Sequence, residues 1–499
     1  MMRRRDQLAG GIVSAVALAV ILSGCHAASA SAPPPTPTPS ATRTAQDWHF
    51  VTRPDLTPPV ITPTTTGTSG SAAVQAGEGQ EVFLGPKDPT TGVAMQGELI
   101  VDASGDPVWV EDSDVGTFSF REQQYQGEPV LTYWVGNSTS YGHGDIVILD
   151  NTYTQIAAVT TGGNLEAHQA DMHESDITPQ GTMLLTSYPE VQADLSSIGG
   201  PKNGWVLEGV AEEVDIATDK VLFEWNSLDH VPITDTYQPI GEGDGTKANP
   251  FDYFHINSVA LDGPDQLLIS ARHVHAVYEV GRATGDITWQ LGGKESSFTF
   301  GPDAAFAWQH DARRQADGTI TLFDNEASPT TSRGLRLSLD MSTMTATMVT
   351  QFLPPTTRLS STQGNVQVLA DGNVFVGWGS EPYYSEYTAS GQLLLDYTFT
   401  AGTSYRAFRA PWVGMPKDPP DAVLQYNGST TKAYVSWNGA TQVASWRVLT
   451  GSDADDATQV ATVARSGFET AIPVPNAGTY VEVQALDSSG KVLGSAVAT

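Results

Sequence analysis

A strand–turn–strand unit recurs along most of this chain, and this repeat is the feature that most constrains the fold. Short β-rich runs closed by Gly, Asp and Asn turns return at intervals of about fifty residues. The six units cover residues 96–110, 128–134, 181–225, 265–291, 317–349 and 371–397. A repeat of this size and order predicts a six-bladed β-propeller over residues 73–416, with an insertion near 226–250. Five or seven blades also fit, because the first two units are weakly patterned.

The pattern changes after residue 416. Residues 417–499 contain short strands with Trp437 and Tyr480, and they resemble a fibronectin type III-like β-sandwich. This segment has no cluster of catalytic residue types, so we expect it to act in packing or as a spacer. The predicted fold class is all-β, with a propeller followed by a sandwich.

Residues 1–25 read as a targeting segment. Arginines at positions 3–5 precede an apolar run over residues 8–22, which is short for a membrane span but typical of a secretory signal. The run ends in Leu22–Cys25, a sequence that resembles the lipobox of bacterial lipoproteins. That resemblance implies cleavage before the cysteine and lipidation of its thiol.

Either form of processing predicts export. Lipidation of Cys25 would anchor the protein at the outer face of the cell membrane, whereas an ordinary signal peptide would be cut near Ala28 or Ala30. Residues 26–72 are rich in Pro, Thr and Ser and predict an extended tether. An aromatic patch at residues 47–51 interrupts the tether, and we expect it to dock on the folded body.

Composition excludes several classes of function. The net charge is −31 and charged residues make up only 16% of the chain, which argues against binding to nucleic acid or electrostatic binding to anionic lipid. The single cysteine excludes a disulfide framework, a cysteine-based zinc site and an iron–sulfur cluster. No Walker-type loop for ATP or PAPS is present.

Three histidines stand just before strands in successive units. They are His173, His255 and His310, and Arg272 ends the strand that follows His255. Blade-entry loops of a propeller surround one central channel, so we expect these four side chains to meet there.

Longer segments around these residues resemble a known family. They are residues 252–259, 267–280, 285–294, 306–315, 318–328, 332–337 and 363–380. They are similar to the bacterial arylsulfotransferase family, in its second, actinobacterial and fungal branch. The similarity covers about His173 to Trp412 and, more loosely, the whole propeller. It implies a six-bladed propeller that moves a sulfuryl group from an aryl sulfate donor to a phenolic acceptor without PAPS or another cofactor, through a sulfohistidine.

The resemblance also implies roles for individual residues. His310 matches the histidine that takes the sulfuryl group, and His173, His255 and Arg272 match the other catalytic positions. This chain departs from the better-known enterobacterial branch, since its loops are shorter and the cysteine pair of that branch is missing.

Asn257, Arg313 and Trp308 are the candidates for substrate contact. Each also has a structural alternative. Asn257 could hydrogen-bond to a neighbouring loop, and Arg313 could form an ion pair at the rim of the channel. Trp308 could pack within its blade, or its indole could hold an aryl ring.

Elementary chemistry supports these roles. A sulfuryl group in transfer carries charge on three oxygens, and Arg272 offers a permanent cation with several donors. A neutral imidazole is a competent nucleophile near pH 7. We expect carboxylates such as Glu174 or Asp311 to set the protonation of the histidines.

Other functions remain open. The same channel could bind an anionic or aryl ligand without catalysis, or the protein could be an envelope scaffold. A zinc site built from the three histidines fits the ligand count, but Arg272 beside it would oppose a divalent cation, so no metal is predicted. The sequence leaves the oligomeric state open.

Overall fold

The computed structural model describes residues 48–64, 80–87, 95–113, 115–139, 141–428 and 430–499. This part of the chain is all-β, as predicted, and its only helices are the short 3-10 turns η1 (Ser196–Ile198), η2 (Ser227–Asp229) and η3 (Ile233–Asp235). None of the described helices has the length and apolar character needed to span a membrane. The predicted signal segment with Cys25 lies outside the described residues.

Six sheets of four or five strands follow one another along residues 81–410. The first sheet contains β29 (Thr403–Ala410), β2 (Glu81–Lys87), β3 (Gly97–Val101) and β4 (Pro107–Asp112). The second contains β5 (Gly116–Tyr125), β6 (Glu128–Ser138), β7 (Gly142–Leu149) and β8 (Gln155–Val159). The third contains β9 (Ser175–Ile177), β10 (Thr182–Ser187), β13 (Val210–Asp215) and β14 (Lys220–Asn226).

The other three sheets repeat this plan. The fourth contains β16 (Ile256–Leu261), β17 (Gln266–Ala271), β18 (Ala276–Gly281) and β19 (Ile287–Gly292). The fifth contains β21 (His310–Arg314), β22 (Ile320–Ser328), β23 (Thr331–Asp340), β24 (Thr345–Phe352) and β20 (Thr299–Phe300). The sixth contains β25 (Asn365–Val368), β26 (Val374–Gly377), β27 (Tyr383–Tyr387), β28 (Leu393–Phe399) and β1 (Ile61–Pro63).

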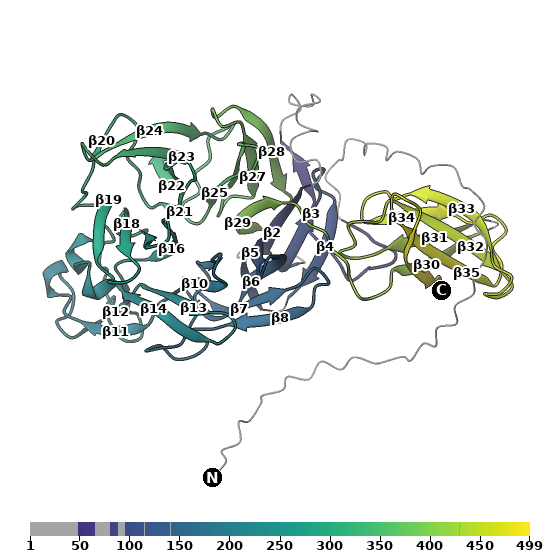
Figure 1. Cartoon of the computed structure of the whole chain (residues 1–499), viewed down its shortest axis with the longest axis horizontal. Coiled ribbons are helices and arrows are strands. Elements are labelled where there is room, and N and C mark those ends of the chain that lie inside the picture. Colours follow the sequence, from purple (N-terminus) through teal and green to yellow (C-terminus); the bar gives the residue numbers. More distant parts are fainter. Residues whose placement is uncertain (1–47, 65–79, 88–94, 114, 140, 429) are drawn as a thin grey trace, which may run out of the picture.

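The six sheets form a closed, propeller-like ring (Figure 1). Contacts run from β29 to β5, from β5 to β9, from β10 to β16, from β16 to β21, from β21 to β25 and from β25 back to β29. The ring closes because β29, which comes from the C-terminal end of the ring's sequence, pairs antiparallel with β2. The innermost strand of each sheet faces a shared centre, and these strands are β29, β5, β9, β16, β21 and β25.

Glycine turns reverse the chain between the first two strands of three of the sheets. Gly181, Gly318 and Gly372 stand between the first and second strands of their sheets, with φ of +78°, +84° and +88°. These angles lie in the left-handed region, which glycine enters without the steric cost of a Cβ atom. The strand that follows the first of these turns, β10, is buried along its whole length. Such a strand packs against neighbouring sheets on both faces.

Residues 48–64 pack on the folded body, as expected for the aromatic patch at 47–51 but not for the rest of this part of the predicted tether. Phe50 is buried with its ring 4.5 Å from that of Phe468. Leu56 and Ile61 join the same apolar cluster, and β1 extends the sixth sheet by pairing with β28. Burial of these apolar side chains offsets the entropy lost by ordering the segment.

Two further sheets follow the ring. One contains β30 (Asp421–Asn427), β31 (Thr430–Ser436) and β34 (Glu469–Pro473), and the other contains β33 (Thr458–Ala464), β32 (Ser445–Gly451), β35 (Tyr480–Leu486) and β36 (Val492–Val497). They share one apolar core that includes Trp446. The Asn438 side chain bonds to both backbone groups of Val110, so these sheets contact the first sheet of the ring.

An insertion interrupts the third sheet on both sides of β13 and β14. Before them, β11 (Glu190–Ala193) and β12 (Gly204–Leu207) form a hairpin, to which β15 (Phe251–Asp252) adds in parallel. After them, η2 and η3 lie within the insertion expected near residues 226–250. Gln238, Asp244 and Phe251 from this region line the cavity described next.

Candidate functional site

The structure brings His173, His255, His310 and Arg272 together on the wall of one cavity of about 680 Å³. His173 lies just before β9, His255 just before β16, and His310 is the first residue of β21. These are equivalent positions at the starts of the innermost strands of three successive sheets. Arg272 directly follows β17, the second strand of the fourth sheet.

The imidazoles lie close to one another. The ring centroids of His173 and His255 are 5.0 Å apart, and those of His255 and His273 are 4.5 Å apart. His255 has a φ of +54°, a left-handed conformation that is uncommon for a residue with a side chain. Unfavourable backbone conformations of this kind cluster at functional sites, where the surrounding structure holds them in place.

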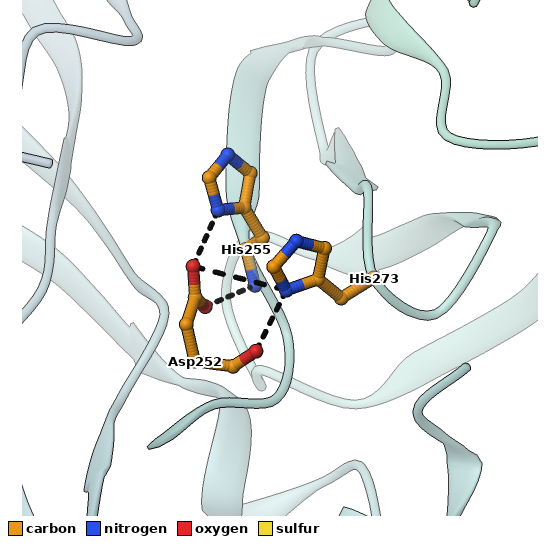
Figure 2. A group of neighbouring side chains, drawn as sticks. All are labelled: Asp252, His255 and His273. Carbon is orange, nitrogen blue, oxygen red and sulfur yellow. Dashed lines mark hydrogen bonds and ion pairs between the residues drawn. The ribbon is translucent and has the colours of Figure 1, made fainter. Parts of the chain in front are cut away.

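Carboxylates near in sequence orient two of the histidines. The Nδ1 of His173 donates to Asp171, and the Nδ1 of His255 donates to Asp252 at 2.5 Å. His273 also uses its Nδ1, which donates to the backbone carbonyl of Asp252 at 2.6 Å (Figure 2). These bonds leave the Nε2 atoms of His173 and His255 for the cavity. Glu174 and Asp311 were predicted for this task, but the partners are Asp171 and Asp252. The D-x-H spacing of Asp171 and His173 and the D-x-x-H spacing of Asp252 and His255 are the local signals of these pairs.

Burial and positive charge keep most of these imidazoles neutral. Burial lowers the pKa of His255 well below its usual value, and His173 and Arg272 lower it further. Burial likewise lowers the pKa of His273 to about 3. Burial and the nearby Arg272 lower the pKa of His310 well below the usual range. The charged form of a buried imidazole is disfavoured because the low-dielectric interior does not solvate it.

Hydrogen bonds set the tautomer of His310. Its Nδ1 lies 2.8 Å from Oδ1 of Asn325, and its Nε2 accepts the backbone N–H of Gln363 at 3.1 Å. An acceptor at Nε2 requires the lone pair there, so the proton is on Nδ1. Asn325 is itself held by the backbone carbonyls of Ser360 and Gln363. His310 is thus a neutral imidazole at the cavity wall, and its Nε2 lone pair becomes available for attack when the bond from Gln363 opens.

Arg272 is held by neutral partners. Its Nη1 donates to Nε2 of His273 at 2.8 Å, and its Nη2 donates to the carbonyl of Ser361 at 3.0 Å. The guanidinium also lies 4.8 Å from the ring centroid of Trp308. Within the described residues its Nε has no partner, and no carboxylate forms an ion pair with it. Its positive charge is therefore available to an anion in the cavity.

The three residues expected to contact substrate lie elsewhere. Trp308 packs on Arg272 and His275 and is not part of the cavity wall, so it supports the guanidinium. Asn257 is fully buried, and its amide donates to the carbonyl of Gln309 at 2.7 Å, which is the loop hydrogen bond considered as its alternative.

Arg313 belongs to a buried ion network next to the cavity. It pairs with Glu174, Asp311 and Asp176. Glu174 also pairs with Arg406 at 3.1 Å and with Arg121 at 3.4 Å. The network joins four sheets of the ring, and its three arginines are matched by three carboxylates. The network itself therefore adds no net positive charge to the cavity.

Replacing Glu174 by Gln is expected to destabilise the protein by about 3–5 kcal/mol, because three buried guanidinium groups lose their shared partner. Burial alone would raise the pKa of Glu174, but Arg313, Arg406 and Arg121 lower it to about 2. The stabilisation is therefore complete above the unfolded-state pKa of about 4.3 and declines as pH falls toward 2. Denaturant unfolding of wild type and variant between pH 2 and 7 measures both effects. Equal stability of the two proteins at pH 7 would contradict this account, and Gln at the exposed Glu166 is the matched control.

Asp252, His255 and His273 carry side chains of metal-ligand type, and one such atom from each lies within 4.8 Å of the others. Both Nδ1 atoms are bonded to Asp252, as Figure 2 shows, and Arg272 donates to the remaining nitrogen of His273. A divalent cation would replace these bonds beside a permanent cation. The arrangement therefore fits a hydrogen-bonded cluster better than a metal centre.

An aromatic part of the cavity wall lies beside His173 and was not anticipated from the sequence. Tyr405 lies with its ring centroid 5.6 Å from that of His173, and its buried hydroxyl has no hydrogen-bond partner within the described chain. Phe118 and Lys87 line the same wall. These residues come from β29, β5 and β2, far apart in the sequence, so no local pattern could have grouped them.

The fold and site define a class: an all-β, propeller-like protein with a cavity lined by histidines and an unpaired guanidinium. The profile of the Arylsulfotransferase (ASST) family matches residues 121–400, more than half of the chain. The protein therefore belongs to the arylsulfotransferase family, as its sequence motifs suggested. No curated protein matches the chain.

Solved structures similar to this one are distant in sequence. A protein of unknown function from Bacteroides caccae is 11% identical with a TM-score of 0.39, over 66% of this chain and 99% of that one. The periplasmic gluconolactonase PpgL of Pseudomonas aeruginosa is 14% identical with a TM-score of 0.33, over 79% and 99%. The β-propeller domain of Cps50 (Swd1) from Myceliophteria thermophila is 12% identical with a TM-score of 0.31, over 64% and 94%. We carry no functional property over from these proteins.

Proposed function

We propose that this protein is a PAPS-independent aryl-sulfate sulfotransferase that works through a sulfohistidine on His310. The observation that carries the proposal is the meeting of three histidines and an unpaired Arg272 in one cavity, in a chain of the arylsulfotransferase family. A sulfuryl group is a compact anion, and such a cavity supplies both a nucleophile and donors for its oxygens.

In the first half-reaction, Nε2 of His310 attacks the sulfur of an aryl sulfate and the phenolate leaves. The N–S bond forms as the S–O bond to the aryl group breaks. Arg272 supplies positive charge to the sulfuryl oxygens, and the protonated Nδ1 of His310 remains bonded to Asn325. The backbone N–H of Gln363, which bonds to Nε2 in the free protein, must leave this lone pair as the N–S bond forms, and it can then donate to a sulfuryl oxygen.

In the second half-reaction, a phenolic acceptor attacks the sulfur and restores the imidazole. The aromatic wall with Phe118 and Tyr405 supplies apolar surface for the rings of donor and acceptor in turn. The unpartnered hydroxyl of Tyr405 is a donor for an oxygen of either ligand.

Incubation with 4-nitrophenyl sulfate and phenol tests the proposal. We expect phenol-dependent release of 4-nitrophenol, and donor alone should add the mass of one sulfuryl group to the peptide that contains His310. Absence of both signals from correctly folded protein would remove the enzymatic assignment. The second candidate function, anion binding without catalysis, would then be favoured, because the unpaired Arg272 in the cavity supports it as well.

The proposal extends to organisation and location. We propose that the six sheets are the six blades of the propeller over residues 73–416, and that residues 417–499 are a fibronectin type III-like domain. The signal and lipobox features at Cys25 support export and a lipid anchor. Radiolabelled fatty acid incorporation that is lost in Cys25→Ser tests the anchor.

A further inference from the structure

We propose that Lys87, on the aromatic wall of the cavity, accepts the proton of the phenolic acceptor in the second half-reaction. This inference rests on the proposed sulfuryl transfer and adds to it a residue that neither the sequence motifs nor the histidine cluster identify. Lys87 is the last residue of β2, and its backbone pairs with Thr403 of β29 at the closure of the ring.

The surroundings of Lys87 are unusual for a lysine. Its Nζ lies 4.2 Å from the ring centroid of Phe118 and 5.7 Å from that of Tyr405, and the residue lines the same cavity as His310. No described carboxylate lies within ion-pair distance of this Nζ. Burial lowers the pKa of Lys87 to about 7, and no neighbouring charge contributes to that shift. An amine in this setting exists partly in its neutral form near pH 7 and can accept a proton.

The chemistry of the second half-reaction calls for such a group. A phenol has a pKa near 10 and is a poor nucleophile until its proton leaves. Three of the cavity imidazoles are poorly suited to accept that proton. His310 carries the sulfuryl group at this stage, and burial lowers the pKa of both His255 and His273. A proton acceptor whose pKa lies near the working pH is the more effective base.

The proposed step balances as follows. The phenol oxygen forms a bond to sulfur as the S–N bond to His310 breaks, and that electron pair returns to Nε2. The phenol proton moves to Nζ of Lys87, which becomes an ammonium group. When the next aryl sulfate reacts, the ammonium returns the proton to the departing phenolate, so a full exchange between two phenols consumes no net proton.

His173, which is paired with Asp171, is the competing base. The Tyr405 ring neighbours both His173 and Lys87, so either side chain lies near an acceptor that packs on this ring. A third possibility is that Lys87 acts only as a cation for the sulfuryl oxygens. The half-reactions separate these roles, because 4-nitrophenolate is a weak base that departs without a proton, whereas unsubstituted phenol must lose one.

Single-turnover measurements on the full chain test the inference. In Lys87→Met we expect transfer from the sulfo-enzyme to phenol to slow by about 10²-fold or more, and the burst of 4-nitrophenolate to slow much less. A more acidic acceptor such as 4-cyanophenol should be slowed less. Lys87→Arg should not restore transfer to phenol, because a guanidinium keeps its charge but accepts no proton. Lys202→Met, at an exposed lysine, is the matched control.

Each contrary outcome has its own meaning. Equal slowing of both half-reactions in Lys87→Met, or recovery in Lys87→Arg, would overturn the inference in favour of a cation that binds the sulfuryl group. Normal transfer in Lys87→Met together with selective loss in His173→Gln would assign the base to His173. Absence of any burst in the wild type would overturn the proposed function and this inference together. The burst itself shows that a variant is folded.

Discussion

Alanine at His310 is expected to lower the rate of transfer from 4-nitrophenyl sulfate to phenol by at least about 10³-fold, because the variant lacks the atom that takes the sulfuryl group. The neutral tautomer set by Asn325 and Gln363 gives this histidine a lone pair at Nε2 without a need for deprotonation at pH 7. Steady-state kinetics and intact-protein mass after donor treatment measure the effect.

His168→Ala is the matched control for this variant, because His168 is exposed and bonds to Asp145 away from the cavity. Unchanged kinetics in His310→Ala would refute the assignment of the nucleophile. Loss of sulfuryl labelling in His255→Ala with retention in His310→Ala would move the role to His255, whose Nε2 also faces the cavity.

Methionine at Arg272 is expected to lower kcat/KM by about 10²–10³-fold, the loss typical of one donor group for charge that develops in a transition state. The lysine variant should recover only part of this loss, since an ammonium lacks the planar set of donors that contacts several oxygens. Arg336→Met is the control, because this half-buried arginine pairs with the exposed Asp317 away from the cavity.

The same variant separates catalysis from simple binding. If the protein only binds anions, an unreactive aryl sulfonate will raise its melting temperature, the shift will persist in His310→Ala, and it will disappear in Arg272→Met. In that case, neither the wild type nor either variant will turn over an aryl sulfate. Turnover by the wild type that depends on both residues contradicts the binding-only alternative.

The buried network around Glu174 gives the ring a separate means of stabilisation. Glu174 directly follows His173, so one loop supplies both a cavity histidine and the carboxylate that joins the arginines of the neighbouring sheets. Because a buried carboxylate with three guanidinium partners holds its charge to low pH, the network also keeps the inner strands in place around the cavity. A variant that loosens the network is therefore expected to affect activity through the position of His173.

Much of the architecture could be predicted from local sequence. Hydrophobic runs and glycine turns such as Gly318 are formed by residues close together in the sequence. The sequence therefore predicted the strands and their repeat. The positions of His173, His255 and His310 relative to those strands placed all three at equivalent points, and the structure brings them to one cavity. The Asp252 partner of His255 lies three residues away and was within reach of the same reasoning.

What the sequence determined by itself is the set of local elements: strands, turns and the histidines that precede them. The tertiary structure alone decided the partners of charged side chains. Arg313 pairs with Glu174, 139 residues away, instead of facing substrate, and Lys87 meets Phe118 and Tyr405 only when β29 closes the ring. Such pairings depend on sheet order and ring closure, which bring together residues whose separation along the chain carries no signal of contact.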